Sequence, residues 1–162
     1  MKLFVGIDNG LSGGITVIDE NQKIIKSLVM PTLKVNKKTE YDTKKIIENL
    51  KWIFIQQTDI YCCLEKSHVR PVSGKRSCFM TGYGYGLIQG ILESIGVSYE
   101  IVSPQAWMKD LSIVTVDGKG SIPFCRRKWP SYDWTATERS SKPHDGKTDS
   151  ACIALYSYRR NR

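Results

Sequence analysis

The chain has 162 residues, of which 41% are hydrophobic, and 24 Lys and Arg against 16 Asp and Glu give a formal net charge of +8. This length fits a single globular domain over residues 1–162, and no stretch reaches the ~18 apolar residues of a membrane helix. The positive charge favours nucleic acid over a small acidic substrate. With no signal-peptide pattern and no zinc-spaced cysteines, we expect a cytoplasmic protein with reduced thiols and no membrane association.

The first half of the chain predicts a meander followed by a crossover. Residues 2–8 form a near-continuous apolar run, which is typical of a central strand buried on both faces. Turn-forming residues separate it from strands at about 14–19 and 23–29, and a polar, lysine-rich loop follows over 31–41. Asp42 can then cap a helix that carries apolar residues on one face, namely Ile46, Ile47, Leu50, Ile53 and Phe54. Because a helix precedes it, the next strand, 59–65, should run parallel to the first.

The second half predicts mostly helices. A basic loop over 66–77 leads to a helix at about 78–95, which Gly96 can terminate, and then to a strand at 98–102. Further elements are expected as helices at 104–111, 121–129 and 145–158, with a polar loop over 132–143. We therefore predict an α/β fold whose five-stranded mixed sheet has the order 3-2-1-4-5, counted along the chain, with helices on both faces.

Four acidic residues stand at the ends of apolar segments. Asp8 and Glu65 end the two strands expected to be parallel neighbours, so both carboxylates should lie at the carboxyl edge of the sheet, where ligands bind in open α/β folds. Asp145 and Asp149 open the last helix, and Asp149 shares its face with the apolar residues Cys152 and Ile153. Helix capping alone could explain Asp145. Clustered acids resist burial without protons or cations, so the pattern favours a divalent-metal site.

Other residues have more than one interpretation. His68 can contact DNA or simply be solvated, and His144 can act as a metal ligand, as a water-orienting base, or as a cap of its loop. Gly82, Gly86 and Gly90 recur every four residues and leave a flat stripe on the helix at 78–95. This stripe could pack on the protein's own sheet or on a second subunit, with Tyr83, Leu87 and Ile91 beside the contact. Trp107 is expected in the core.

Three segments in a fixed order resemble a known family. Gly6-Ile7-Asp8-Asn9-Gly10 with Gly13-Gly14-Ile15, then Leu64-Glu65-Lys66, then His144-Asp145-Gly146-Lys147-Thr148-Asp149-Ser150 resemble the RuvC-like Holliday junction resolvases, most closely the compact bacteriophage versions. The resemblance covers nearly the whole chain. It differs from the cellular bacterial form in the spacing of the last two acids, which leaves open whether His144, Asp145 or both complete the site.

The resemblance implies an RNase H-like fold and a homodimer that nicks symmetric strands of a four-way junction, in the host cytoplasm if the gene belongs to a phage. It implies two Mg²⁺ ions per active site, with Mn²⁺ as a substitute, held by Asp8, Glu65, Asp145 and Asp149. His144 and Lys119 join the catalytic candidates, although a backbone contact explains Lys119 equally well. Positive residues cluster along the chain, Lys34, Lys37 and Lys38 among them. The expected DNA-binding residues are Lys66, His68, Arg70, Lys75, Arg76, Arg126, Arg127 and Lys128.

Two other classes of function stay open from the sequence. One is an RNase H-fold nuclease that acts on structured RNA, as the pre-16S ribosomal RNA nucleases do, since these share the opening motif. The other is a structure-specific DNA-binding module without catalysis, which the intact set of acids argues against.

Overall fold

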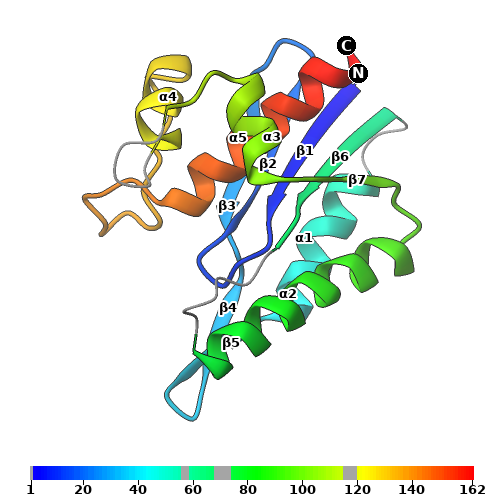
Figure 1. The fold of residues 1–162 in the computed structure, drawn as a ribbon, viewed down its shortest axis with the longest axis vertical. Coiled ribbons are helices and arrows are strands. Elements are labelled where there is room, and N and C mark those ends of the chain that lie inside the picture. The colour runs from blue at the N-terminus through cyan, green and yellow to red at the C-terminus, as the bar shows by residue number, and fades with distance from the viewer. Residues whose placement is uncertain (1, 56–58, 68–73, 115–119) are drawn as a thin grey trace.

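The computed structural model describes residues 2–55, 59–67, 74–114 and 120–162 of the chain. One sheet contains five strands in the order β3-β2-β1-β6-β7 (Figure 1). These strands are β1 (Lys2–Asp8), β2 (Gly14–Asp19), β3 (Ile24–Val29), β6 (Asp59–Glu65) and β7 (Tyr99–Val102). β1 pairs antiparallel with β2 and parallel with β6, and β7 is parallel to β6. The predicted sheet and its order are confirmed.

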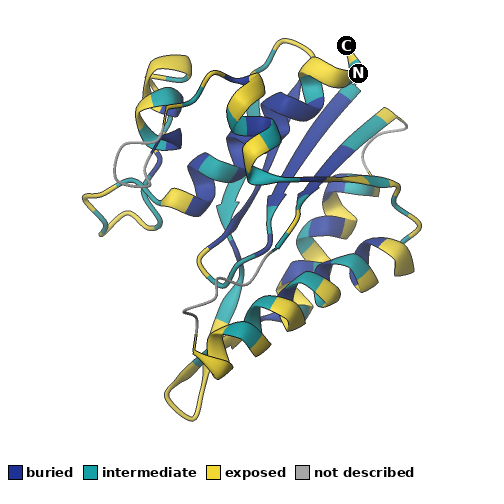
Figure 2. Cartoon of the chain, in the orientation of Figure 1, coloured by how far each residue is buried: buried dark blue, intermediate teal, exposed yellow. Residues whose placement is uncertain are grey.

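Helices cover both faces of this sheet (Figure 1). α1 (Thr43–Ile55) and α2 (Lys75–Ser94) pack on one face, and α3 (Pro104–Asp110), α4 (Ser121–Lys128) and α5 (Asp145–Asn161) pack on the other. The adjacent residues Cys62 and Cys63 belong to the two different cores, as alternation along a strand requires. Burial is deepest along β1, β2 and α5, in the middle of the molecule (Figure 2). None of the described helices is both long enough and apolar enough to cross a membrane.

The backbone of α5 lies unusually close to β1 because glycines stand at the contact. A Cβ atom on Gly6 would lie 2.1 Å from the Ser150 carbonyl oxygen and 2.3 Å from the Ala154 amide nitrogen. Gly146 meets the turn after β1 in the same way, since its Cβ would lie 2.3 Å from the carbonyl carbon of Gly13. Real Cβ atoms do not approach backbone this closely, so both positions require glycine. This contact fixes the first turns of α5 beside the carboxyl end of β1.

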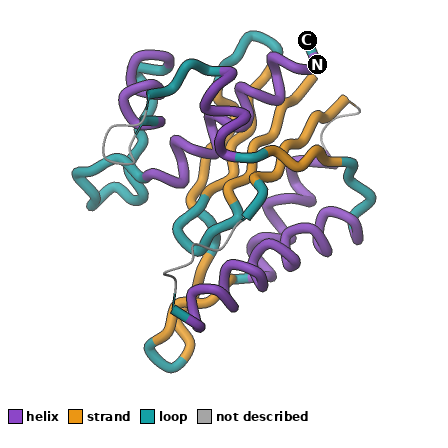
Figure 3. The backbone as a smooth tube through the Cα atoms, in the orientation of Figure 1, coloured by secondary structure: helices purple, strands orange, loops and turns teal. Residues whose placement is uncertain are grey.

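The segment predicted as a loop over 31–41 is instead a β-hairpin (Figure 3). Its strands are β4 (Thr32–Val35) and β5 (Lys38–Tyr41), which pair antiparallel in a separate two-stranded sheet. Asn36 and Lys37 form the turn with positive φ angles of 48° and 64°, the conformation of the tight turns that match strand twist. The prediction failed because lysines and short strands hide the alternating pattern, and because a non-glycine residue takes the second turn position.

The boundaries of the helices agree closely with the sequence. The Asp42 side chain accepts a hydrogen bond from the Lys45 amide (3.1 Å), which confirms the predicted cap of α1. Gly96 has a φ of 73° and ends the turn after α2, also as predicted. α2 begins at Lys75, so it includes the last residues of the segment expected as a basic loop. Residues 68–73 of that loop lie outside the described part.

Candidate metal and nucleic-acid site

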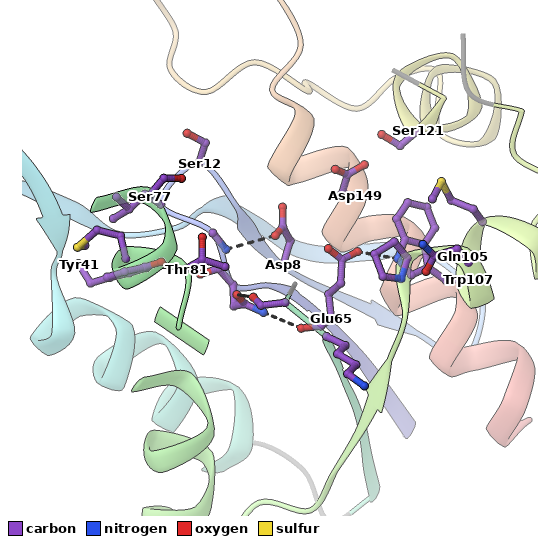
Figure 4. A pocket seen from close by; sticks show the side chains of 18 of the residues that line it. Asp8, Ser12, Tyr41, Glu65, Ser77, Thr81, Gln105, Trp107, Ser121 and Asp149 are labelled. Carbon is purple, nitrogen blue, oxygen red and sulfur yellow. Dashed lines mark hydrogen bonds between the residues drawn. The ribbon is translucent and has the colours of Figure 1, made fainter. Parts of the chain in front are cut away.

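Three elements bring three carboxylates together at the carboxyl edge of the sheet (Figure 4). Asp8 ends β1 and Glu65 ends β6, and these parallel strands pair with Ile7 beside Leu64. Asp149 projects from α5, where Gly6 and Gly146 hold the helix close to the sheet. In Figure 4 the carboxyl groups of Asp8, Glu65 and Asp149 point toward the same space. The expected convergence of acids from distant parts of the sequence is therefore present.

Burial and mutual repulsion make these carboxylates hard to ionise. Burial raises the pKa of Asp8 to about 6, although the Gly10 backbone amide, which donates to its Oδ1, acts in the opposite direction. Burial and the Asp8 charge raise the pKa of Glu65 to about 8. Burial raises the pKa of Asp149 to about 7; a hydrogen bond with Ser121 acts in the opposite direction, and the charges of Asp8 and Asp145 add smaller increases. Such shifts indicate charges that need a compensating cation.

The chemistry of these residues fits a divalent metal ion. None of the ion pairs formed between described residues involves Asp8, Glu65 or Asp149. Carboxylate oxygens are hard donors of the kind that Mg²⁺ and Mn²⁺ prefer. Across residues 2–55, 59–67, 74–114 and 120–162, no three His, Cys, Asp or Glu side chains are grouped closely enough to hold an ion as they stand. The chemistry of the three carboxyl groups, rather than their present spacing, is therefore what fits a divalent ion.

Trp107 orients one of the acids. Its indole Nε1–H donates a 2.7 Å hydrogen bond to Oε2 of Glu65, and this bond lowers the pKa of Glu65 against the larger effect of burial. The indole ring itself is buried in the core between α3 and the sheet, as predicted. No pattern in the sequence predicts the contact with Glu65, because α3 and β6 are far apart along the chain.

Asn9 forms hydrogen bonds that connect the end of β1 with the end of β6. Its side-chain amide donates to the Glu65 carbonyl oxygen (2.6 Å), and its side-chain oxygen accepts a hydrogen bond from Ser67. The Tyr41 hydroxyl donates to the Asn9 carbonyl oxygen (2.9 Å), so the base of the β4–β5 hairpin is also attached to this turn. The Asn9 side chain thus joins the turn after β1 to the end of β6.

The three acids lie in a cleft with a volume of about 800 Å³. On one side the first turns of α2 contribute Arg76, Ser77 and Thr81, and on the other side α3 and the start of α4 contribute Gln105 and Ser121. Lys66 and Arg76 are the basic residues among those that line the cleft in the described part of the chain, and both are exposed. A cleft with acids at its floor and cations at its wall can hold metal ions beneath a phosphate backbone.

The other predicted site residues lie further out. Asp145 is exposed at the first position of α5, and His144 is its half-buried N-terminal neighbour; neither lines the cleft. The Nδ1 atom of His144 is buried and has no hydrogen-bond partner among the residues that the structure describes. Lys75 is exposed at the start of α2. Three predicted residues, Lys119, His68 and Arg70, lie outside the described residues.

The basic residues of α4 form its last turn. Arg126, Arg127 and Lys128 are all exposed, which agrees with the favourable placement of cations at a helix C-terminus. The Lys128 ammonium donates to the side chain of Gln22, and Trp129 donates to the Gln22 carbonyl oxygen (2.7 Å). These contacts hold the end of α4 against the turn between β2 and β3.

The glycine stripe of α2 faces away from the sheet. A Cβ atom on Gly82, Gly86 or Gly90 would meet nothing within 4 Å, so the stripe does not pack on the protein's own sheet. Tyr83 is exposed beside it, whereas Ile91 is only 6% exposed and belongs to the core. Ile91 was therefore wrongly expected to flank a contact with another subunit.

Comparison with solved structures shows which known fold this is. A structure of Thermus thermophilus RuvC in complex with a Holliday junction substrate matches with a TM-score of 0.63 and 12% sequence identity, over 99% of this chain and 96% of that one. The chain has the fold of RuvC. A second Thermus thermophilus RuvC structure matches with a TM-score of 0.60 and 14% identity, over 98% of this chain and 95% of that one. No protein-family model and no curated protein sequence matches. At this identity the RuvC likeness establishes the RNase H-like fold alone. Any activity has to be argued from the residues of the site.

Proposed function

We propose that this chain is a divalent-metal-dependent endonuclease that resolves four-way DNA junctions by paired nicks. The observation that carries the proposal is the convergence of Asp8, Glu65 and Asp149 in one cleft of a RuvC fold, with raised pKa values and without an ion pair to any residue that the structure describes. Structural ion pairs would leave the acids compensated, and isolated surface acids would have ordinary pKa values. A site that binds metal cations accounts for the raised pKa values and for the missing ion pairs among the described residues. The net charge of +8 suits a polyanionic substrate.

Each acid has a distinct role in this proposal. Asp8 lies between the other two and raises the pKa of both, so it would be the ligand shared by two bound ions. Glu65, oriented by Trp107, and Asp149 would hold the ions together with Asp8, and either Asp145, one helical turn before Asp149, or His144 would be the fourth ligand. Bound Mg²⁺, or Mn²⁺ in its place, would supply an activated water and stabilise the leaving oxygen. His144 and Lys119 are our candidates for completing the site.

The basic residues around the cleft would hold the DNA. Lys66 follows Glu65 directly, and Arg76 stands on the wall of the cleft, so both can contact the phosphates that flank the cut. The basic turn of α4 offers a further contact to the backbone. Such contacts position the substrate through its charge and shape rather than its sequence.

A homodimer would match the symmetry of a four-way junction. Paired nicks on two equivalent strands require two active sites related by a two-fold axis, and an isologous contact provides one. The open glycine stripe of α2 supports this arrangement, because two such helices can approach closely where no side chains intervene. α2 also carries Arg76 at the cleft, so dimerisation through α2 would bring both active sites close to the junction centre.

A cleavage assay on matched substrates tests the proposal. Labelled four-way junctions, Y-junctions, linear duplex and structured RNA are incubated with the protein in Mg²⁺, Mn²⁺ or EDTA. We expect symmetric nicks in the four-way junction with either metal and none in EDTA, and the variant Asp8→Asn should bind the junction without cutting it. Preferential cleavage of RNA would show that the proposed substrate is wrong. Binding of the junction by the parent protein without metal-dependent cleavage would show that the proposed activity is wrong.

A further inference from the structure

The β4–β5 hairpin extends beyond the carboxyl edge of the main sheet, beside the first turns of α2 (Figure 1). All residues from Leu33 to Lys38 are exposed, so most of the hairpin is a free two-stranded ribbon. It carries Lys34, Lys37 and Lys38 against the single acid Glu40. A two-stranded ribbon has the dimensions that the major groove of DNA admits, and this one carries a net positive charge.

The base of the hairpin is firmly attached to the active-site cleft. Tyr41, its last residue, is buried, lines the cleft and donates a hydrogen bond to the backbone of Asn9, the residue after Asp8. The Asp42 amide donates to the Pro31 carbonyl oxygen (2.9 Å) and closes the hairpin at its root. α2 comes so close that a Cβ on Gly84 would lie 2.0 Å from the Tyr41 hydroxyl oxygen. The ribbon is thus held in a fixed direction relative to the acids.

The cations occupy particular positions on this ribbon. In the hairpin register Thr32 pairs with Tyr41 and Lys34 pairs with Thr39, so Lys34 lies on the same face as Tyr41. Lys37 stands in the turn at the tip. Tyr41 lies four residue steps after Lys37, which is about 14 Å at the rise of a β-strand. Phosphates along one DNA strand are spaced at roughly 3.4 Å of helix axis, so the tip lies about four phosphates from the edge of the cleft.

We propose that the β4–β5 hairpin is a second DNA-contacting element, in which Lys34 and Lys37 contact phosphates on the duplex arm that leaves the active-site cleft. This inference rests on the proposed function, because it assumes that branched DNA occupies the cleft. It adds a surface that fixes the direction of one arm relative to the cut. The remaining face of the ribbon, with Leu33 and Val35 about 40% and 38% exposed, is not required for this contact.

The test compares two variants with the same change in charge. The first is Lys34→Gln with Lys37→Asn, because asparagine accepts the positive φ of the turn. The control is Lys23→Gln with Lys51→Gln; both lysines are exposed, and Lys23 lies at the opposite edge of the sheet from Asp8. Equal melting temperatures establish that both variants keep the fold. Affinity for a four-way junction with long arms is then measured in EDTA over a range of salt concentrations.

Two lost phosphate contacts should reduce the slope of log affinity against log salt by about 1.8. Between 50 and 200 mM salt, the advantage of the parent over the hairpin variant should then shrink by about twelve-fold, while the control keeps the slope of the parent. Neutral methylphosphonates at the third to sixth linkages from the cut should weaken the parent and the control but not the hairpin variant. Equal slopes for all three proteins would overturn the proposal and would point to a protein partner or bare solvent on the ribbon. Failure of the parent itself to bind junctions would overturn both this inference and the proposed function.

Discussion

The three cleft acids should make the metal-free protein less stable as the pH rises. A folded-state pKa above the unfolded value means that the folded protein binds the proton more tightly. The stability that this proton contributes is therefore fully present below the unfolded pKa and is lost as the pH rises through the folded pKa. For Asp8 this window runs from the ordinary value of 3.8 to about 6. Each pKa unit corresponds to 1.36 kcal/mol, so the ionised Asp8 carboxylate costs about 3 kcal/mol at pH 8.

Replacing Asp8 by Asn removes this cost without removing the oxygen that accepts the Gly10 amide. In EDTA at pH 8 we expect Asp8→Asn to be more stable than the parent by about 3 kcal/mol, or roughly 6–12 °C in melting temperature. The difference should shrink to well under 1 kcal/mol near pH 4, where the folded carboxyl group is protonated and the unfolded one, with its ordinary pKa of 3.8, is only about half ionised. Millimolar Mg²⁺ should stabilise the parent and leave the variant unchanged, because only the parent keeps the complete site.

Urea denaturation at pH 4, 6 and 8, with EDTA or with Mg²⁺, measures all of these differences. Glu48→Gln is the matched control, since it removes an exposed acid of α1 at a distance from the cleft. A stability difference between Asp8→Asn and the parent that stays the same from pH 4 to pH 8 would refute the reasoning. So would a response of Asp8→Asn to Mg²⁺ as large as that of the parent.

Three further outcomes follow from particular contacts. Trp107→Phe removes the hydrogen bond that lowers the pKa of Glu65, so the pH profile of nicking should move to higher pH. Trp107→Tyr serves as the conservative comparison, and an unchanged pH profile for Trp107→Phe would contradict the positioning role of Trp107. Gly86→Leu should leave a folded monomer in sedimentation if the parent is a dimer, because the stripe faces open space, and a variant that still dimerises would rule out this interface. Gly6→Ala should lower the free energy of unfolding by about 3 kcal/mol, because the added methyl group clashes with the backbone of α5. Urea denaturation measures this loss, and a loss below about 1 kcal/mol would mean that α5 can shift to make room for the methyl group.

The sequence predicted the sheet and the convergence of acids because both depend on strong local signals. Apolar runs that end in Asp8 and Glu65, with a helix between them, leave few arrangements other than parallel neighbours with adjacent carboxylates. Asp149 could be placed because its helical face is otherwise apolar. These inferences need only the period of each element and the order along the chain.

Features that depend on contacts between distant residues could not be predicted in this way. The Trp107 hydrogen bond to Glu65 and the attachment of Tyr41 to Asn9 join elements with no shared local pattern. The hairpin over 32–41 was missed because its tight turn uses Asn36 and Lys37 rather than a glycine. The direction of the glycine stripe on α2 also needed three-dimensional packing, since helical spacing alone does not say which face meets the sheet.

A supercoiled plasmid that extrudes a cruciform tests the central claim most directly. With Mg²⁺ we expect the parent protein to convert this plasmid to the linear form through paired nicks at the cruciform, and to spare the same plasmid without the inverted repeat. Asp149→Asn should yield no linear product, because it removes one of the three cleft carboxylates. Equal cutting of both plasmids, or cutting of the cruciform that persists in EDTA, would contradict the account.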